Sequence, residues 1–244
     1  MERNTVKLQG FSIDTFTFDD ALEYAANKSG QIVTINPEMI QTASKNPDFA
    51  NIINNAELVV PDGIGVEIGL KILGHKVRRI AGIELGRALI DRLAGEPAAF
   101  IGAKPEIIEK AVDNLKKEVP DLNPVYVQDG YFKDDERVLN ELTQKHPRLV
   151  LVALGSPKQE FFINEAKKRL PDAVFIGLGG SFDVWSGVVQ RAPEIYQKMG
   201  LEWLYRTVKE PQRFKRIFPT LPLFILKVVK EKFIGCLLYT SPSP

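Results

Sequence analysis

Residues 149–180 read LVLVALGSPKQEFFINEAKKRLPDAVFIGLGG, and the fold class can be inferred from them. The apolar run at Leu149–Leu154 predicts a buried strand, Lys158–Arg169 predicts a helix, and Ala173–Ile176 predicts a second buried strand. A helix between two fully apolar strands is typical of a parallel sheet that is covered on both faces. A loop containing glycine follows each strand, and such sheets bind ligands beyond the carboxyl ends of their strands.

The same alternation continues toward the N-terminus. Further strands are predicted at Thr5–Leu8, Ser12–Asp14, Gln31–Ile35, Glu57–Val60, Ala98–Ile101 and Pro124–Val127. Helices are predicted after Thr17 and near Val66–Leu73, Leu85–Leu93, Glu106–Glu118 and Asp134–Lys145. We therefore predict an α/β fold with a mostly parallel, Rossmann-like sheet that carries helices on both faces, followed by a basic helical appendage at the C-terminus.

The chain divides into three predicted parts. Residues 1–193 form the α/β core, and residues 194–235 form the helical appendage, which is rich in aromatic residues and which we expect to be interrupted at Pro211, Pro219 and Pro222. Residues 236–244 (CLLYTSPSP) continue no pattern, and we expect them to be a tail that is not native to the protein.

Charge is distributed unevenly along the chain. The net charge is only +1, yet residues 201–232 contain eight Lys or Arg against three Asp or Glu. Such a block indicates an anionic partner, either a membrane surface, a nucleic acid or a phosphorylated ligand, although a solvated basic helix face has the same composition.

The composition excludes several classes of protein. With 44% hydrophobic and 26% charged residues, the chain is neither a disordered tail, a collagen-like repeat nor a small disulfide scaffold. One cysteine and two histidines favour a reducing compartment and argue against a His/Cys metal site. We find no signal peptide and no apolar run long enough to span a membrane, which predicts a cytoplasmic protein.

Two loops after strands contain polar side chains. In Thr34-Ile35-Asn36-Pro37-Glu38, Asn36 followed by Pro37 is a common helix start, so this loop alone is weak evidence of function. Pro61-Asp62-Gly63 is first of all a turn, but it also places a carboxylate at the end of a buried strand, where an enzyme could use it as a general base.

Two glycine loops suggest a phosphorylated ligand. In Gly155-Ser156-Pro157-Lys158-Gln159-Glu160, Ser156 and Gln159 fit a capping box, and the start of a helix attracts anions. The turn Gly177-Leu178-Gly179-Gly180 allows a ligand to approach the backbone closely.

Other enzyme classes receive less support from the motifs. The chain has no P-loop, no Asp-x-Asp pair and no G-x-S-x-G elbow, which argues against P-loop nucleotidases, many metal-dependent sugar transferases and α/β-hydrolases. Gly63, Gly65 and Gly69 loosely match a dinucleotide turn, so an NAD(P)-binding oxidoreductase stays an alternative. A nucleic-acid-binding module is a second alternative, because aromatic residues are interleaved with the basic segment. A thermal shift with NAD(P) would support the first alternative, and one with an oligonucleotide would support the second.

Six motifs in a fixed order resemble one family. They are Thr34-Ile35-Asn36-Pro37, Pro61-Asp62-Gly63, Gly155-Ser156-Pro157-Lys158-Gln159-Glu160, the run Gly177-Leu178-Gly179-Gly180-Ser181-Phe182-Asp183 with Gly187 and Arg191-Ala192-Pro193, Gly200-Leu201-Glu202-Trp203-Leu204-Tyr205-Arg206, and Glu210-Pro211-Gln212-Arg213 with Arg216. Together they resemble the TagA/WecG/CpsF family of bacterial glycosyltransferases, from about Asn4 to Ile234.

The resemblance implies transfer of N-acetylmannosamine, or its uronic acid, from UDP to N-acetylglucosaminyl-diphosphoundecaprenol in the synthesis of wall teichoic acid or a related surface polysaccharide. The reaction would invert the anomeric carbon without a metal or another cofactor. Implied partners are the UDP-sugar, the polyprenyl-diphosphate-linked acceptor and the anionic inner face of the cell membrane, to which the protein would attach peripherally. No nucleic acid is implied, and a homo-oligomer stays open.

The resemblance also assigns roles to residues of this sequence. Asp62 corresponds to the general base, with Thr34 beside it at the sugar. The expected substrate-binding residues are Asn36, Gly63, Arg79, Gly155, Pro157, Gln159, Gly179, Gly180 and Asp183, together with Arg206, Arg213 and Arg216, which are expected to close over the diphosphate. Glu84 stands where many members have Asp, which leaves the choice of donor sugar open.

Overall fold

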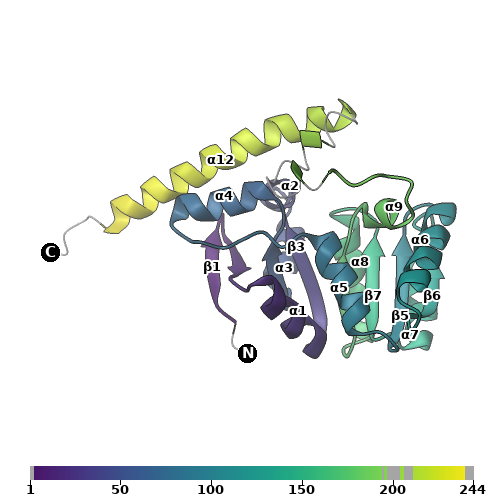
Figure 1. The fold of residues 1–244 in the computed structure, drawn as a ribbon. Coiled ribbons are helices and arrows are strands. Elements are labelled where there is room, and N and C mark those ends of the chain that lie inside the picture. Colours follow the sequence, from purple (N-terminus) through teal and green to yellow (C-terminus); the bar gives the residue numbers. More distant parts are fainter. Residues whose placement is uncertain (1–2, 194, 197–203, 206–210, 240–244) are drawn as a thin grey trace.

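The structure, a computed structural model, describes residues 3–193, 195–196, 204–205 and 211–239, and in the last helix it describes the side chains of residues 220–234. Six strands form one parallel sheet in the order β4-β3-β8-β7-β5-β6 (Figure 1). They are β3 (Gly30–Ile35), β4 (Leu58–Pro61), β5 (Pro97–Gly102), β6 (Asn123–Gln128), β7 (Leu149–Ala153) and β8 (Val174–Gly177). The predicted parallel sheet is therefore confirmed, with every strand boundary within one residue of its prediction.

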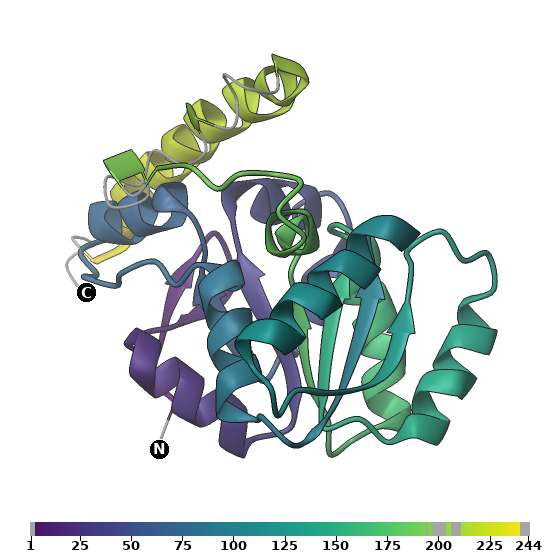
Figure 2. The same ribbon diagram turned by 45° about the vertical axis from the view of Figure 1, so that its right-hand side comes forward.

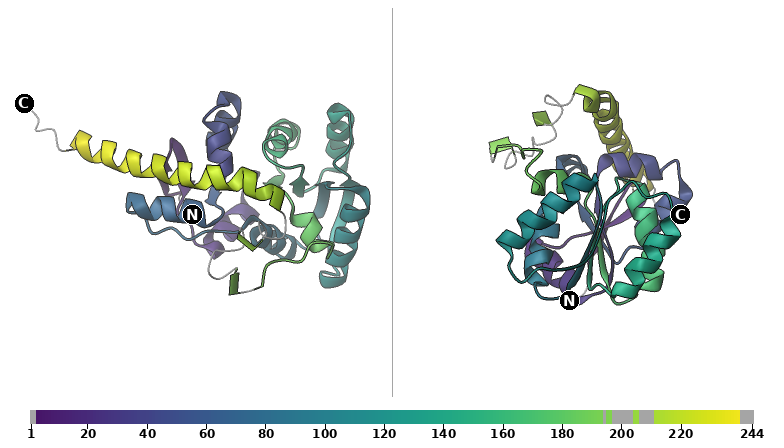
Figure 3. Two further views of the ribbon diagram at one scale, coloured as in Figure 1. Left: turned by 90° about the horizontal axis from the view of Figure 1, so that it is seen from above. Right: turned by 90° about the vertical axis from the view of Figure 1, so that its right-hand side faces the viewer.

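Alternate residues of the strands face opposite sides of the sheet, and the described residues form three hydrophobic cores, one on one side and two on the other. One core contains Ile32 and Val60 with side chains of α1 (Phe18–Asn27), α5 (Gly82–Arg92), α6 (Pro105–Glu118) and α9 (Ser181–Trp185). Helices α2 (Pro37–Ala43), α3 (Pro47–Asn54), α7 (Asp135–Lys145) and α8 (Lys158–Arg169) cover the other face. Figure 2 shows α1, α5 and α6 in front of the sheet, and the right-hand view of Figure 3 shows helices on both sides.

An antiparallel pair of strands, β1 (Thr5–Leu8) and β2 (Phe11–Asp14), forms a separate small sheet, and β2 lies against the edge strand β4. The carboxylate of Asp14 is fully buried, and it accepts hydrogen bonds from the Val59 backbone N–H (2.8 Å) and from Nε and Nη2 of Arg3 (2.8 Å each). A buried carboxylate is tolerated only when it is paired in this way. The ion pair of Asp14 with Arg3 therefore holds β4, the strand that ends immediately before Asp62.

The C-terminal helix α12 (Pro211–Tyr239) lies along α4 (Ile64–Leu73) and near α2, as Figure 1 and the left-hand view of Figure 3 show. Phe224 and Val228 of α12 are fully buried in the core that also contains Leu70 of α4. A Cβ at Gly69 would lie 3.1 Å from the Phe224 ring, and a Cβ at Gly65 would lie 2.8 Å from Leu221. Two glycines four residues apart thus form the flat face of α4 that receives α12.

This packing removes the main support for the oxidoreductase alternative. Gly65 and Gly69 serve contact between two helices, so they do not form a turn against a dinucleotide. The expected interruptions at Pro219 and Pro222 are also wrong, because α12 continues through both residues, while Pro211 stands at its first position. Each internal proline removes one backbone hydrogen bond, and the burial of Phe224 and Val228 just beyond them stabilises the helix there.

Two hydrogen bonds fasten α12 to the core. The backbone carbonyl of Thr220 accepts a hydrogen bond from Gln41 Nε2 at 2.6 Å. Glu231 accepts from the backbone N–H of Gln9 and, at 2.7 Å, from its side-chain amide. Among the helices in the described part of the chain, none is both long and apolar enough to cross a membrane.

We predict that Phe224→Ala lowers the free energy of unfolding by about 3–5 kcal/mol, because it leaves a cavity between α12 and α4. Leu226→Ala in the same helix is the control, since Leu226 is 66% exposed and its loss should cost less than about 0.5 kcal/mol. Urea denaturation of both variants measures the difference. Equal stability of the two variants would show that α12 does not pack on α4 in solution.

Candidate functional site

The register of β3 and β4 brings the first two polar loops together. Thr34 pairs with Val60 and Ile35 pairs with Pro61, so Asn36 and Asp62 follow the ends of two adjacent strands. The backbone N–H of Asp62 donates to the carbonyl of Ile35 at 2.8 Å, which extends the pairing into the loop. Asp62 is half-buried at this edge of the sheet. Gly63 then turns with a φ of +81°, a conformation that glycine adopts without strain, and α4 begins.

Thr34 lies under the start of α5. Thr34 is 9% exposed, and a Cβ at Gly82 would lie 3.0 Å from Thr34 Oγ1. The chain returns to this point because the N–H of Ile80 donates to the carbonyl of Pro61 at 2.7 Å. Arg79, half-buried and next in the chain, is thereby placed close to the end of β4, and its own N–H donates to Glu67 Oε2 at 2.9 Å.

Asn36 caps α2 as the sequence predicts. Its Oδ1 accepts hydrogen bonds from the N–H groups of Glu38 (3.1 Å) and Met39 (3.0 Å), and Pro37 occupies the first helical position. Because the cap uses Oδ1, contact with a ligand would fall to the Nδ2 group, which can only donate.

Gln159 joins the two glycine loops. Its side chain is 5% exposed, its Oε1 accepts from the N–H of Gly179 at 3.1 Å, and its Nε2 donates to Glu160 Oε1 at 2.7 Å. A Cβ at Gly177 would lie 2.5 Å from Nε2, so only glycine leaves room for the amide. Gly155, Pro157 and Gln159 after β7 are thus linked to the Gly179 and Gly180 turn after β8.

The predicted capping box at this helix is wrong. Pro157 is the N-cap residue of α8, and no side chain caps this helix. The N–H of Gln159 donates to the Gly155 carbonyl at 2.9 Å, and that of Glu160 donates to the Pro157 carbonyl at 3.1 Å. The turn is closed by its own backbone, which leaves the Gln159 side chain available to reach across to the next loop.

Asp183 lies on the first turn of α9, directly after the second glycine loop. A Cβ at Gly180 would lie 3.6 Å from Asp183 Oδ2, so the carboxylate is next to that glycine. The backbone of this short helix is secured because the Asp183 carbonyl accepts from Ser186 Oγ (2.8 Å) and the Val189 N–H (3.0 Å).

The helix that follows β8 packs on one face of the sheet, and the helices that follow its two neighbours, β3 and β7, pack on the opposite face. Phe182 of α9 packs on one face, whereas Met39 of α2 and Phe162 of α8, which follow β3 and β7, pack on the other. Ligands of open α/β sheets bind where neighbouring strands lead to opposite faces. The Gly177–Gly180 turn is therefore at the centre of the candidate site, with Asn36 and Gly155 in the flanking loops.

Glu160 is a residue whose burial the sequence analysis missed. It is 2% exposed, and burial raises the pKa of its carboxyl above the ordinary value, against smaller opposing effects of hydrogen bonds from Gln159 and Ser156. The burial of Glu160 could have been predicted from the sequence, because Glu160 stands three and six residues before the apolar Ile163 and Ala166 on the buried side of α8.

The sequence analysis also did not predict the ion pair between Arg191 and Glu84 of α5.

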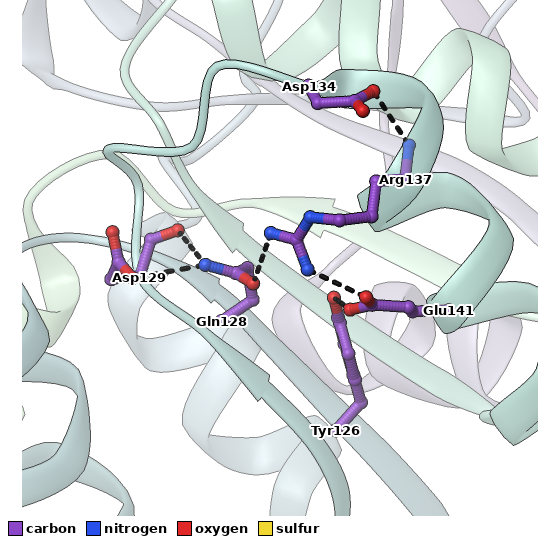
Figure 4. A network of polar contacts seen from close by, with 6 residues as sticks. All are labelled: Tyr126, Gln128, Asp129, Asp134, Arg137 and Glu141. Atoms are coloured by element: carbon purple, nitrogen blue, oxygen red, sulfur yellow. Dashed lines mark hydrogen bonds and ion pairs between the residues drawn. The ribbon is translucent and has the colours of Figure 1, made fainter.

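A separate polar network lies between β6 and α7 (Figure 4). Arg137 Nη1 donates to Glu141 at 2.7 Å, and the Tyr126 hydroxyl donates to the same carboxylate at 2.8 Å. Burial, and then Glu141, raise the pKa of Tyr126, while Arg137 lowers the pKa of Glu141. The network also contains Gln128, Asp129 and Asp134, the last as N-cap of α7. It ties the edge strand β6 to its covering helix.

The side chains of three predicted binding arginines lie outside the described part of the structure. Arg206 lies outside the described residues, and so do the side chains of Arg213 and Arg216 in α12. Within the described parts of the chain, no three His, Cys, Asp or Glu side chains are grouped so that they could hold a metal ion.

Comparison with known proteins identifies the family of this chain. The model of the Glycosyl transferase WecG/TagA/CpsF family matches residues 6–235, which is nearly the whole chain. The chain belongs to this family. It is therefore a glycosyltransferase, and the resemblance inferred from six motifs is confirmed.

Two relatives from this family share a name. A protein of Bacillus spizizenii W23 is 38% identical over 209 residues, which cover 84% of this chain and 81% of the relative. A protein of Bacillus subtilis strain 168 is 36% identical over 234 residues, which cover 93% of this chain and 91% of the relative. Both are named N-acetylglucosaminyldiphosphoundecaprenol N-acetyl-beta-D-mannosaminyltransferase.

Glu160 makes stability depend on pH. Because its pKa is raised in the folded state, the folded protein holds this proton to a higher pH than the unfolded chain does. Stability is therefore lost as the pH rises from the ordinary pKa of glutamate to the raised one. Glu160→Gln cannot ionise, so its stability relative to wild type should increase through that interval and then level off.

Urea denaturation at a series of pH values measures this difference, and Glu109→Gln, which changes an exposed carboxyl of α6, shows the effect of removing an ordinary carboxyl. A Glu160→Gln curve that runs parallel to wild type at all pH values would contradict the raised pKa.

Proposed function

We propose that this glycosyltransferase transfers N-acetylmannosamine from UDP to N-acetylglucosaminyl-diphosphoundecaprenol, with inversion at the anomeric carbon and without a metal. The observation that carries the proposal is the name shared by two relatives that match this chain over 81% and 91% of their lengths. That name describes transfer of N-acetylmannosamine, so we take this sugar, and not its uronic acid, as the donor group. The UDP carrier and the absence of a metal rest on the resemblance of the motifs.

Asp62 is the proposed general base. In an inverting transfer, an acceptor hydroxyl attacks the anomeric carbon from the side opposite UDP, the bond from that carbon to the diphosphate oxygen breaks, and the hydroxyl proton passes to a base. A single carboxylate is sufficient for this step. The position of Asp62 supports the role, because its backbone is fixed to the end of β3 beside Thr34 and Asn36.

UDP leaves with additional negative charge on its diphosphate. Without a metal, fixed hydrogen-bond donors and cations must stabilise that charge, and each such group is worth roughly 3 kcal/mol in a closed site. We assign the sugar to Thr34 and Asn36, the diphosphate to the loops at Gly155 and Gly179, and charge neutralisation to Arg79. Arg206, Arg213 and Arg216 are proposed to add positive charge from the C-terminal segment.

The protein is further proposed to bind peripherally to the inner face of the cell membrane through α12. Leu226 is 66% exposed and Phe233 is 65% exposed, and Lys230 and Lys232 are exposed near them. Leu226, Lys230 and Phe233 recur at helical spacing on the side opposite the buried Phe224 and Val228. Apolar side chains flanked by lysines are the pattern of a helix that lies in the surface of an anionic bilayer. A lipid-linked acceptor would then be within reach.

The test of the reaction measures UDP release from UDP-N-acetylmannosamine with a short-chain lipid-linked acceptor, in excess chelator. We expect turnover with this donor, and a loss of about 10²–10⁴-fold in Asp62→Asn with binding of UDP retained. The acceptor hydroxyl keeps its proton in that variant, while the nucleotide contacts are unchanged.

Asp172→Asn is the matched control, since Asp172 is exposed and precedes β8 at the opposite edge of the sheet. Full activity of Asp62→Asn would reduce Asp62 to a turn residue. Activity that disappears with chelator and returns with Mg²⁺ or Mn²⁺ would refute the metal-free reaction, and turnover of another UDP-sugar alone would refute the donor.

Membrane binding is tested by co-sedimentation with vesicles that contain phosphatidylglycerol. The wild-type protein should bind them, more weakly at high salt, and Leu226→Asp with Phe233→Asp should bind several-fold more weakly because the inserted surface becomes charged. Tyr131→Asp changes an equally exposed ring near β6 and should bind like wild type. Equal binding of all three proteins would exclude α12 as the contact surface.

A further inference from the structure

We propose that Glu160 is a positioning residue for the transfer reaction: it fixes the side-chain amide of Gln159, which in turn holds the Gly177–Gly180 turn in the conformation that receives the diphosphate of the donor. The proposal rests on the function proposed above only for the identity of the ligand. Its structural part stands on two hydrogen bonds, from Gln159 Nε2 to Glu160 Oε1 (2.7 Å) and from the Gly179 N–H to Gln159 Oε1 (3.1 Å).

The two bonds permit one orientation of the amide. A primary amide has an oxygen that accepts and an NH₂ group that donates, and a backbone N–H can only donate. The amide oxygen must therefore face Gly179, which directs the NH₂ group to Glu160. A carboxyl group accepts from that NH₂ whether it is ionised or protonated, so the arrangement holds in both states of Glu160.

The surroundings leave the amide no room for another position. A Cβ at Gly177 would lie 2.5 Å from Gln159 Nε2 and 2.9 Å from its Cδ, so the amide rests directly on the backbone of β8. Gly179 follows two residues later with a φ of +50°, and its N–H is the group that the amide holds. A change in the orientation of Gln159 must then be transmitted to the turn.

Packing alone does not explain a carboxyl at this position. Glu160 is 2% exposed, and its neighbours on α8, Phe162 and Ile163, are buried in an apolar core. Burying a carboxyl costs free energy unless its hydrogen bonds compensate, and an apolar side chain would fill the same space without that cost. The carboxyl supplies an acceptor for Gln159 Nε2, and for the neighbouring Ser156 hydroxyl, that an apolar residue cannot supply.

Glu160→Met and Glu160→Gln separate positioning from packing. Methionine fills the space but accepts no strong hydrogen bond, so we expect the Kd for UDP and the KM for the donor to rise about tenfold, with the KM for the acceptor unchanged. Glutamine retains an accepting oxygen and should restore both values to within about twofold of wild type. The midpoint of thermal unfolding of Glu160→Met should be equal to or above that of wild type.

Gln31→Met is the matched control. Gln31 is another fully buried polar residue, at the amino end of β3, and in the described structure neither polar atom of its side chain has a hydrogen-bond partner. Its replacement removes the same kind of group at the edge of the sheet away from the site. Binding of UDP and all kinetic constants should be unchanged.

Hydrogen exchange at the Gly179 amide gives a readout that needs no ligand. Exchange should be faster in Glu160→Met, like wild type in Glu160→Gln, and unchanged at Ile176 within β8 in both. If wild type neither binds UDP nor turns over a UDP-sugar, the proposed function fails, and this exchange measurement still decides the role of Glu160. Positioning is refuted if Glu160→Met matches wild type in exchange at Gly179, if it binds UDP as wild type does, or if Glu160→Gln is as impaired as Glu160→Met.

Discussion

Parallel pairing of β3 with β4 on one side and β8 on the other is the constraint on which the rest of the site depends. Parallel strands end at the same edge, so the register that pairs Ile35 with Pro61 also sets Asn36 beside Asp62. The pairing can persist only because both faces of the sheet are buried, which requires helices on both sides and hence long connections between strands. The site is a consequence of those connections leaving the sheet in different directions around β8.

Much of this arrangement could be predicted because it follows from local sequence. Apolar runs gave every strand of the parallel sheet to within one residue, and Asn36 with Pro37 predicted the start of α2, since a cap involves only neighbouring residues. The resemblance of six ordered motifs predicted the family. Roles of single residues, such as Asp62 as base, depend on contacts with the substrates and stay predictions.

The predictions that were wrong share one physical cause, which is that a residue distant in sequence determines the local structure. Gly65 and Gly69 look like a ligand turn until Phe224 and Leu221 of α12 are seen against them. Pro219 and Pro222 predict a break from local chemistry, yet the helix continues where its next turns are buried on α4. Gln159 fits a local capping box, but its side chain bonds to Gly179, twenty residues away.

The polar groups of the site are held largely by the backbone around them. Asn36 is fixed by the first turn of α2, Gln159 by Gly179 and Glu160, and the chain at Asp62 by the end of β3. Groups that are already oriented need not be reorganised when charge develops on a leaving group, and this is the condition under which hydrogen-bond donors contribute most to catalysis. A site built on strand ends therefore obtains rigid groups from the sheet, while access for the proposed lipid-linked acceptor would depend on elements outside the sheet. The position of α12 along α4, with Leu221 against Gly65, fits that division, because it connects a surface with exposed Leu226 and Phe233 to the helix that begins two residues after Asp62.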